Sequence, residues 1–147
     1  MWRTKGEGEI YAYLPYSNPP KALCGSSLNV CNPDYGMSLG RGTFRFAAGK
    51  WTHVRQVLTM NTPGKQDGRI VLYSNNKKVF TQKNVVFRTN SAGRVSGISK
   101  YIKESILIFS YLSLLVFHTF FGGSDNSWET PKDQYSYFKD FSLKAIY

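Results

Sequence analysis

Apolar and polar residues alternate in several short stretches of the chain, which is the pattern of half-buried β-strands. In "GEIYAYLPY", Ile10, Ala12 and Leu14 alternate with Tyr11 and Tyr13. Successive side chains of an extended chain point to opposite faces, so the small apolar residues face one way and the two phenols the other. The stretch therefore predicts a strand that presents two tyrosines side by side.

The same alternation predicts further strands. "GTFRFAAGKW" reads as a strand and a turn, and "WTHVRQVLTM" as an interior strand, because both of its faces carry apolar residues. "GRIVLYSNNKKVFTQKNVVFR" predicts a strand, a hairpin turn and a further pair of short strands. "YSYFKDFSLKAIY" predicts another half-buried strand. Short strands joined by Gly, Asn and Pro turns predict one all-β domain over residues 1–147, an antiparallel sandwich of jelly-roll type.

One segment lacks this alternation of polar and apolar residues. Residues 105–124, "SILIFSYLSLLVFHTFFGGS", contain no charged side chain. A run of 20 residues is long enough for a membrane helix, so contact with a membrane is expected only if 105–124 is a true span. The flanking "TFFGGSDNSW" instead reads as the end of a strand and a glycine turn.

Charge and aromatic content narrow the possible partners. The net charge is +10, without a polybasic block, and aromatic residues make up 16% of the chain. A positive surface attracts polyanions such as nucleic acids, anionic membranes and acidic polysaccharides. Aromatic side chains suit strands and surfaces that stack on sugars or bases. Charge alone does not choose among these partners.

The two cysteines are Cys24 and Cys31, which lie seven positions apart in a loop rich in Ser, Asn and Pro. They can form a small disulfide loop in an oxidising compartment, or remain free thiols in a reducing one. Without a His cluster or a CxxC pair, we expect no zinc site, no other metal and no cofactor. The N-terminal "MWRTKGEGE" is charged and enters a strand pattern at once, so we do not expect it to act as a signal peptide, and secretion cannot be read from it.

Several stretches together resemble polysaccharide lyase family 14. They are "MWRTKGEGEIYAYLPY", "GMSLGRGTFRFAAGKWTHV", "DGRIVLY" and "TFFGGSDNSWETPKDQYSYFKDF". The resemblance implies a concanavalin-like jelly roll, and a secreted, monomeric protein that acts on uronic-acid polymers such as alginate or glucuronan. Cleavage in this family is a β-elimination, in which the C5 proton is abstracted and the glycosidic oxygen leaves C4.

This chemistry needs a cation to neutralise the carboxylate, a base and an acid. The family assigns the work to a lysine, a serine, an arginine and a Tyr-X-Tyr pair, which Tyr11 and Tyr13 match here. A phenol near cations can lose or share its proton, and can then act as base and acid in turn. The alternative is that both tyrosines are ordinary strand surface.

Three further residues are candidates for substrate binding. Arg3 is positioned to hold a substrate carboxylate, His118 to line the cleft, and Trp128 to stack on a sugar ring. Each has a structural alternative: a solvated arginine, a structural histidine, and a tryptophan that seals one end of the sandwich.

The chain also departs from the family pattern. In the family, the lysine-bearing strand lies upstream of the "MWR" match, and the serine and arginine come just before it. We therefore expect a chain truncated at its N-terminus, with little or no lyase activity by itself.

The second departure is an insert at residues 99–116. Ser99-Lys100-Tyr101 can be encoded with a 5′ splice consensus, and Leu115-Val116 with the closing AG, so a retained intron explains the insert. A genuine apolar helical insertion and a membrane span are the alternatives.

Three functions remain open from the sequence. The first is a lyase-like protein that depolymerises an acidic polysaccharide, impaired in this chain. The second is a non-catalytic carbohydrate-binding sandwich. The third is a basic nucleic-acid-binding module, although nucleic acid is not the expected partner because no recognition motif is present.

Overall fold

A computed structural model of the chain describes residues 3–16, 20–32, 34–91, 94–99, 112–116, 127 and 132–144. Within it the chain forms two compact units, residues 1–93 and 94–147. Each unit is described by itself.

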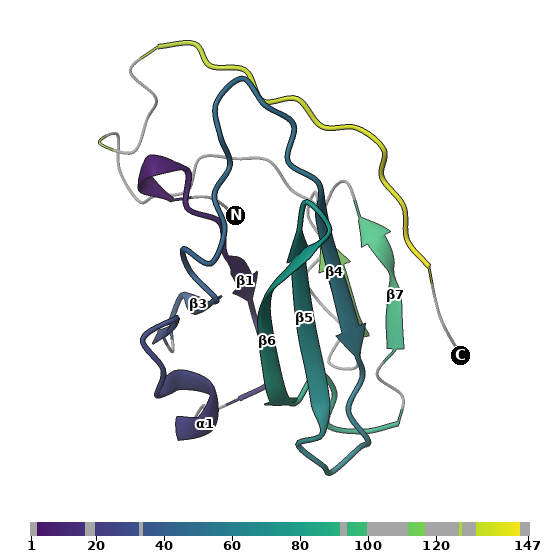
Figure 1. Cartoon of the computed structure of the whole chain (residues 1–147). Helices are drawn as coiled ribbons and strands as arrows, with labels where there is room; N and C mark the ends of the chain where they lie inside the picture. The colour runs from purple at the N-terminus through teal and green to yellow at the C-terminus, as the bar shows by residue number, and fades with distance from the viewer. Residues whose placement is uncertain are drawn as a thin grey trace. The chain divides into compact units, whose positions relative to one another are not determined.

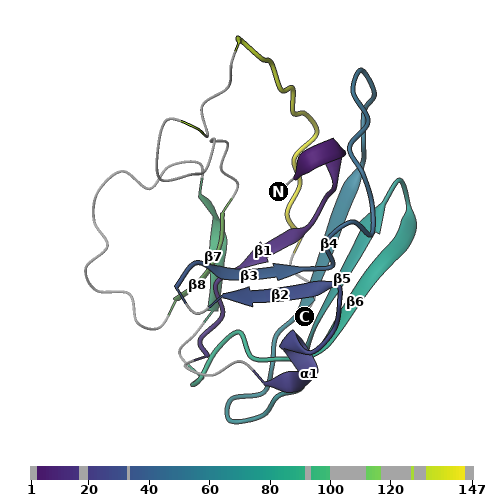
Figure 2. The same ribbon diagram turned by 90° about the vertical axis from the view of Figure 1, so that its left-hand side faces the viewer.

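The first unit contains two three-stranded antiparallel sheets. One has the order β1-β3-β2 and is seen in Figure 2; its strands are β1 (Ile10–Ala12), β2 (Asn29–Asn32) and β3 (Gly36–Leu39). The other has the order β4-β5-β6 and is seen in Figure 1; its strands are β4 (Val54–Thr59), β5 (Gly68–Ser74) and β6 (Lys77–Val85). A 3₁₀ turn, η1 (Thr4–Gly6), precedes β1, and a short helix, α1 (Lys21–Cys24), precedes β2.

The core of this unit is built from one face of each sheet. Strand register places Ile10 opposite Leu39 and Ala12 opposite Met37, so these side chains share one face. They pack with Ile70 and other buried residues in a single cluster whose remaining buried members are Leu23, Phe44, Leu72, Phe80 and Val85. Full burial of an aliphatic or aromatic side chain contributes about 1.5–3 kcal/mol. The opposite face of β1 therefore points away from the core.

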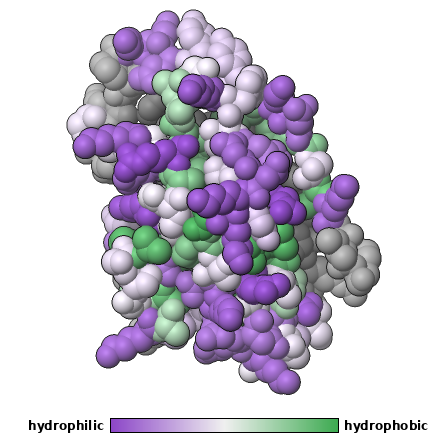
Figure 3. All heavy atoms as spheres, viewed as in Figure 1, coloured by the Kyte–Doolittle hydropathy of each residue, from purple (hydrophilic) through white to green (hydrophobic). Residues whose placement is uncertain are grey.

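The second sheet agrees with the sequence prediction at its hairpin turn and differs from it in two of its strands. A hairpin turn at Asn75 and Asn76, both with positive φ (48° and 66°), joins β5 to β6 as predicted. The predicted pair of short strands is instead one strand, Lys77–Val85. Strand β4 was predicted to be interior, but within the described part of the chain it pairs with β5 alone and is largely exposed. Hydrophilic side chains predominate over these strands in Figure 3.

The predicted strand in "GTFRFAAGKW" is reduced to an isolated bridge between Glu7 and Arg45. Two backbone hydrogen bonds flank it, from Gly8 N to the Phe44 carbonyl (2.9 Å) and from Phe46 N to a carbonyl in η1 (2.8 Å). The Phe44 ring occupies the space that a Cβ at Gly8 would need. Glycine at position 8 thus lets a buried aromatic ring close one end of the core.

A disulfide and a buried amide fix α1 against the sheets. Cys24 and Cys31 form a disulfide with a Cα–Cα distance of 5.6 Å. Nearby, the Asn29 side-chain amide donates to the Leu23 carbonyl (2.6 Å) and to Gln82 Oε1 (2.8 Å). Helix α1, β2 and β6 are consequently connected by both covalent and polar contacts.

Tyr16 links the segment after β1 to the end of β6. Its hydroxyl accepts a hydrogen bond from Val86 N (2.8 Å) and donates to the Asn84 carbonyl (3.4 Å). Burial raises the pKa of Tyr16, against the smaller lowering effect of Val86 N–H, so the hydroxyl stays protonated at neutral pH.

Tyr16→Phe is expected to lower the free energy of unfolding by about 1–2 kcal/mol, because Val86 N–H loses its partner. Urea unfolding followed by circular dichroism measures the change. Tyr135→Phe, at an exposed phenol, is the control and should shift the midpoint little. Equal effects of the two substitutions would contradict the assigned contact.

The second unit contains two paired strands among its described residues, β7 (Arg94–Ser99) and β8 (Leu112–Val116). Their pairing is parallel, with Arg94 opposite Leu112, whereas an antiparallel sandwich was expected throughout. Strand β8 lies inside both the uncharged run and the predicted insert, so this part of the insert is a strand and not the helix that one alternative required. None of the helices in the described residues is long and apolar enough to cross a membrane.

The predicted C-terminal strand is wrong for the residues described. Residues 132–144 have no regular secondary structure and are exposed, including Tyr135, Tyr137 and Phe141. Alternation indicates only that a segment suits a sheet; a strand forms when a neighbouring strand supplies hydrogen bonds and a packing surface.

Candidate functional site

The candidate site is the face of β1 that points away from the core. Tyr11 and Tyr13 lie there side by side, as the alternation predicts, with ring centroids 5.5 Å apart and planes at 74°. Tyr13 is 79% exposed, and Tyr11 is half-buried. The Tyr11 hydroxyl donates to the backbone carbonyl of Tyr35. Both phenols are therefore outside the hydrophobic core.

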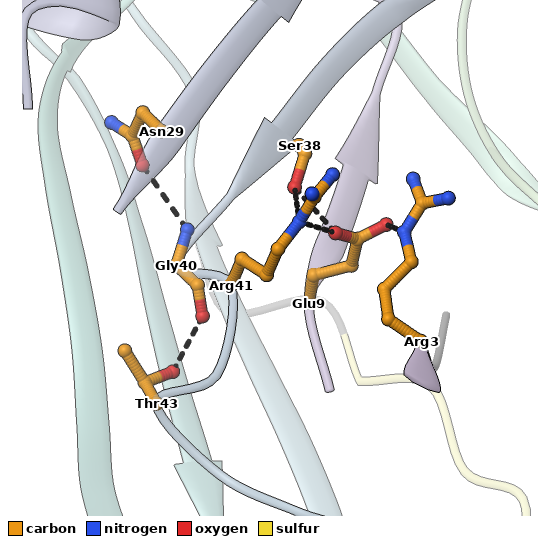
Figure 4. Close-up of polar contacts among 7 residues, drawn as sticks. All are labelled: Arg3, Glu9, Asn29, Ser38, Gly40, Arg41 and Thr43. Carbon is orange, nitrogen blue, oxygen red and sulfur yellow. Dashed lines mark hydrogen bonds and ion pairs between the residues drawn. The ribbon is translucent and has the colours of Figure 1, made fainter. Parts of the chain in front are cut away.

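Glu9 organises the charged part of this face, two residues before Tyr11 on the same side of the chain. Its carboxylate is completely buried and pairs with two arginines: Oε1 accepts from Arg3 Nε (2.7 Å) and Oε2 from Arg41 Nε (2.9 Å). Ser38, opposite Tyr11 in the register, donates its hydroxyl proton to Oε2. Figure 4 shows the two guanidinium groups on either side of the carboxylate. We call Arg3, Glu9, Ser38 and Arg41 the arginine clamp.

A tight loop after β3 places Arg41 in the clamp. Gly40 has a φ of 66°, which favours glycine, and the Phe80 ring fills the space where a Cβ would lie. The Gly40 amide donates to Asn29 Oδ1 (3.1 Å), and its carbonyl accepts from Thr43 Oγ1 (2.7 Å), as Figure 4 shows. The Phe80 ring and the side chains of Asn29 and Thr43 therefore hold the loop in this conformation.

The surroundings of Tyr11 affect its pKa in opposing ways. Arg3 Cζ lies 5.7 Å from the centroid of the Tyr11 ring, within the range of a cation–π contact. Burial and the neighbouring Tyr13 nevertheless raise the pKa of Tyr11, and they outweigh the lowering effect of Arg3. Arg3 thus acts on the Tyr11 phenol in the expected direction, but its effect is the smaller one, and Tyr11 stays protonated at neutral pH.

The sequence analysis identified Arg3, Tyr11 and Tyr13, and the structure brings these three together. It did not identify Glu9, Ser38 or Arg41. Glu9 had a usable signal, because its two-residue spacing from Tyr11 places it on the tyrosine face. The other two candidates for substrate binding, His118 and Trp128, lie outside the described residues.

The described residues contain a hollow away from the clamp and no group of metal ligands. A hollow of about 260 Å³ lies beside the β4–β5 loop, lined by Gly64, Lys65, Gln66, Val86, Arg88 and Thr89, none of which belongs to the clamp or the tyrosine pair. Among the residues that the structure describes, no three His, Cys, Asp or Glu side chains are grouped to hold a metal ion.

Comparison with known proteins identifies the class. The family Polysaccharide lyase 14 matches residues 1–102 and 109–141, and the chain belongs to this family. A crystal structure of a marine PL-14 alginate lyase from Aplysia kurodai matches with a TM-score of 0.52 and 33% sequence identity. The match covers 60% of this chain and 35% of that enzyme, so the chain spans about a third of its length. Curated proteins give no significant match.

These findings confirm the family resemblance and the all-β jelly-roll fold class. The family match is also interrupted at residues 103–108. This gap falls inside the predicted insert at residues 99–116, whose origin stays a prediction.

Proposed function

We propose that this protein is a polysaccharide-lyase-like protein that depolymerises an acidic uronate polysaccharide by β-elimination, with low activity in this chain by itself because the lysine, serine and arginine of the family are unmatched here. The observation that carries the proposal is the pair of phenols on the outer face of β1, next to the arginine clamp, in a chain of this family. An alginate-type or glucuronan-type polymer is the proposed substrate class.

In the proposed reaction, one phenolate removes the proton from C5 of a uronate residue. The released electron pair forms the C4–C5 double bond, the C4–O bond breaks, and the departing glycosidic oxygen takes a proton. We assign the donor role to Tyr11, since its pKa is raised and it keeps its proton. Tyr13, which is far more exposed, is assigned the role of base. Positive charge near the substrate carboxylate stabilises the enolate-like transition state.

A carbohydrate-binding protein without catalysis is the second candidate. The observation that favours it is the hydrogen bond from the Tyr11 hydroxyl to the Tyr35 carbonyl, which engages the proton that a lyase must donate. In this alternative, the exposed Tyr13 ring stacks on a sugar, and the arginines select acidic polymers.

We also propose that the protein is secreted, as the resemblance implies. The Cys24–Cys31 disulfide supports this, because such bonds persist in oxidising compartments. Expression with and without export to an oxidising compartment, followed by thiol labelling, tests it. Two free thiols in the exported protein would contradict the proposal.

The function is tested by incubating the protein with polyglucuronate and with alginate and following the ultraviolet absorbance of the unsaturated product. A rise in absorbance that the Tyr11→Phe/Tyr13→Phe double variant does not give supports the lyase. Binding of either polymer without absorbance supports the carbohydrate-binding alternative. Salt-sensitive binding to DNA of unrelated sequences, with no binding of a polyuronate, would overturn both.

A further inference from the structure

The two arginines of the clamp contact Glu9 through Nε and not through their terminal nitrogens. Arg3 Nε and Arg41 Nε each contact one oxygen of Glu9, and Arg41 Nε also lies 3.1 Å from Ser38 Oγ. In Figure 4 the contacts drawn to both guanidinium groups end at Nε. Glu9 therefore fixes the direction of each guanidinium group while leaving its terminal N–H groups for another partner.

From this geometry we infer that Arg3 and Arg41 form a binding subsite for a carboxylate of an acidic polysaccharide. The inference rests on the proposed function, and it assigns to the clamp the selection of acidic over neutral polymers. Terminal guanidinium nitrogens bind carboxylates through two parallel hydrogen bonds, which gives both strength and orientation.

The charge balance of the clamp fits an anionic ligand. Two guanidinium groups and one carboxylate leave one positive charge in excess, and a uronate carboxylate would neutralise it. The Glu9 side chain is 0% exposed, whereas those of Arg3 and Arg41 are 29% and 37% exposed. The anion of the protein is thus hidden from a ligand, and the cations are accessible to it.

The position of the clamp fits the same ligand. Arg3 contacts the Tyr11 ring, and Ser38 lies opposite Tyr11 in the register of β1 and β3. A uronate bound by the arginines would therefore lie next to the two phenols. The rigidity given by Glu9 lowers the entropy lost when a ligand orders the arginine side chains.

The test is binding of tetraglucuronate and of cellotetraose, its counterpart without carboxylates, measured by isothermal titration calorimetry. We expect Arg41→Gln to weaken binding of tetraglucuronate by about 10- to 100-fold, the range for charged hydrogen bonds, with cellotetraose unaffected. Arg41→Lys keeps the positive charge but loses the two parallel N–H donors of the guanidinium group. Its affinity for tetraglucuronate should lie between those of the unaltered protein and Arg41→Gln. Arg55→Gln is the matched control: Arg55 stacks on Tyr73 in the other sheet, 3.9 Å from the ring centroid.

A measurement on the unaltered protein covers the possibility that a variant fails to fold. Tetraglucuronate should protect Arg3 and Arg41, but not Arg55, from modification by phenylglyoxal, read by mass spectrometry. Lack of protection, or equal weakening by Arg41→Gln and Arg55→Gln, would overturn the inference.

The inference and the proposed function fail in different ways. Turnover of polyglucuronate with unchanged binding in Arg41→Gln would refute the subsite and keep the lyase. Carboxylate-dependent binding that Arg41→Gln abolishes, without any unsaturated product, would keep the subsite and refute the lyase.

Discussion

Tyr13→Phe is expected to lower the rate of formation of unsaturated uronate by about 100- to 10,000-fold relative to the unaltered protein, the usual contribution of a positioned acid or base. Only the hydroxyl is removed, so the edge-to-face contact of the ring with Tyr11 is kept. The rate is measured from the absorbance of the product, with polymer concentration varied to separate kcat from KM. We expect the loss in kcat.

Tyr35→Phe is the matched control for this prediction. Tyr35 is also exposed, and its backbone carbonyl, which the substitution keeps, accepts the hydrogen bond from Tyr11. Its rate should remain close to that of the unaltered protein. If Tyr13→Phe and Tyr35→Phe had the same rate, Tyr13 would not be the base.

Asn61→Leu is expected to lower the free energy of unfolding by about 3 kcal/mol, since several partly buried backbone groups lose their partners at once. Asn61 is fully buried in the loop that follows β4. Its side-chain nitrogen donates to the carbonyls of Thr62 (3.0 Å), Lys65 (3.2 Å) and Arg88 (2.9 Å). Its oxygen accepts from the amides of Phe87 (2.8 Å) and Arg88 (3.0 Å).

Chemical denaturation provides the measurement, with Gln66→Leu as the control. Gln66 carries the same functional group in the same loop but is exposed, so its replacement should change stability by no more than about 0.5 kcal/mol. A loss below about 1 kcal/mol in Asn61→Leu would show that the amide does not hold the loop.

Short sequence patterns correctly predicted the features that depend on a single strand or a single turn. The alternation around Tyr11 predicted both the strand and the orientation of the phenols, and the Asn75-Asn76 turn predicted the hairpin. Both features depend on residues within a few positions of one another, and side-chain direction in an extended chain follows from backbone geometry alone.

Features that depend on distant partners were not predicted. Arg41 reaches Glu9 across 32 positions of sequence, and the pairing of β1 with β3 and the loop at Gly40 bring them together. The same reason explains the error for residues 132–144, whose alternation is clear but for which the described chain supplies no pairing strand. The parallel pairing of β7 with β8 is equally non-local.

The Asn29 side chain connects the buried side of the first sheet to the loop that carries Arg41. One amide binds α1 through the Leu23 carbonyl, β6 through Gln82, and the loop of Arg41 through Gly40 N. A substitution at Asn29 should therefore disturb helix α1, strand β6 and the position of Arg41 at the same time. The packing of the interior and the placement of the clamp on the outer face therefore cannot be altered independently at this position.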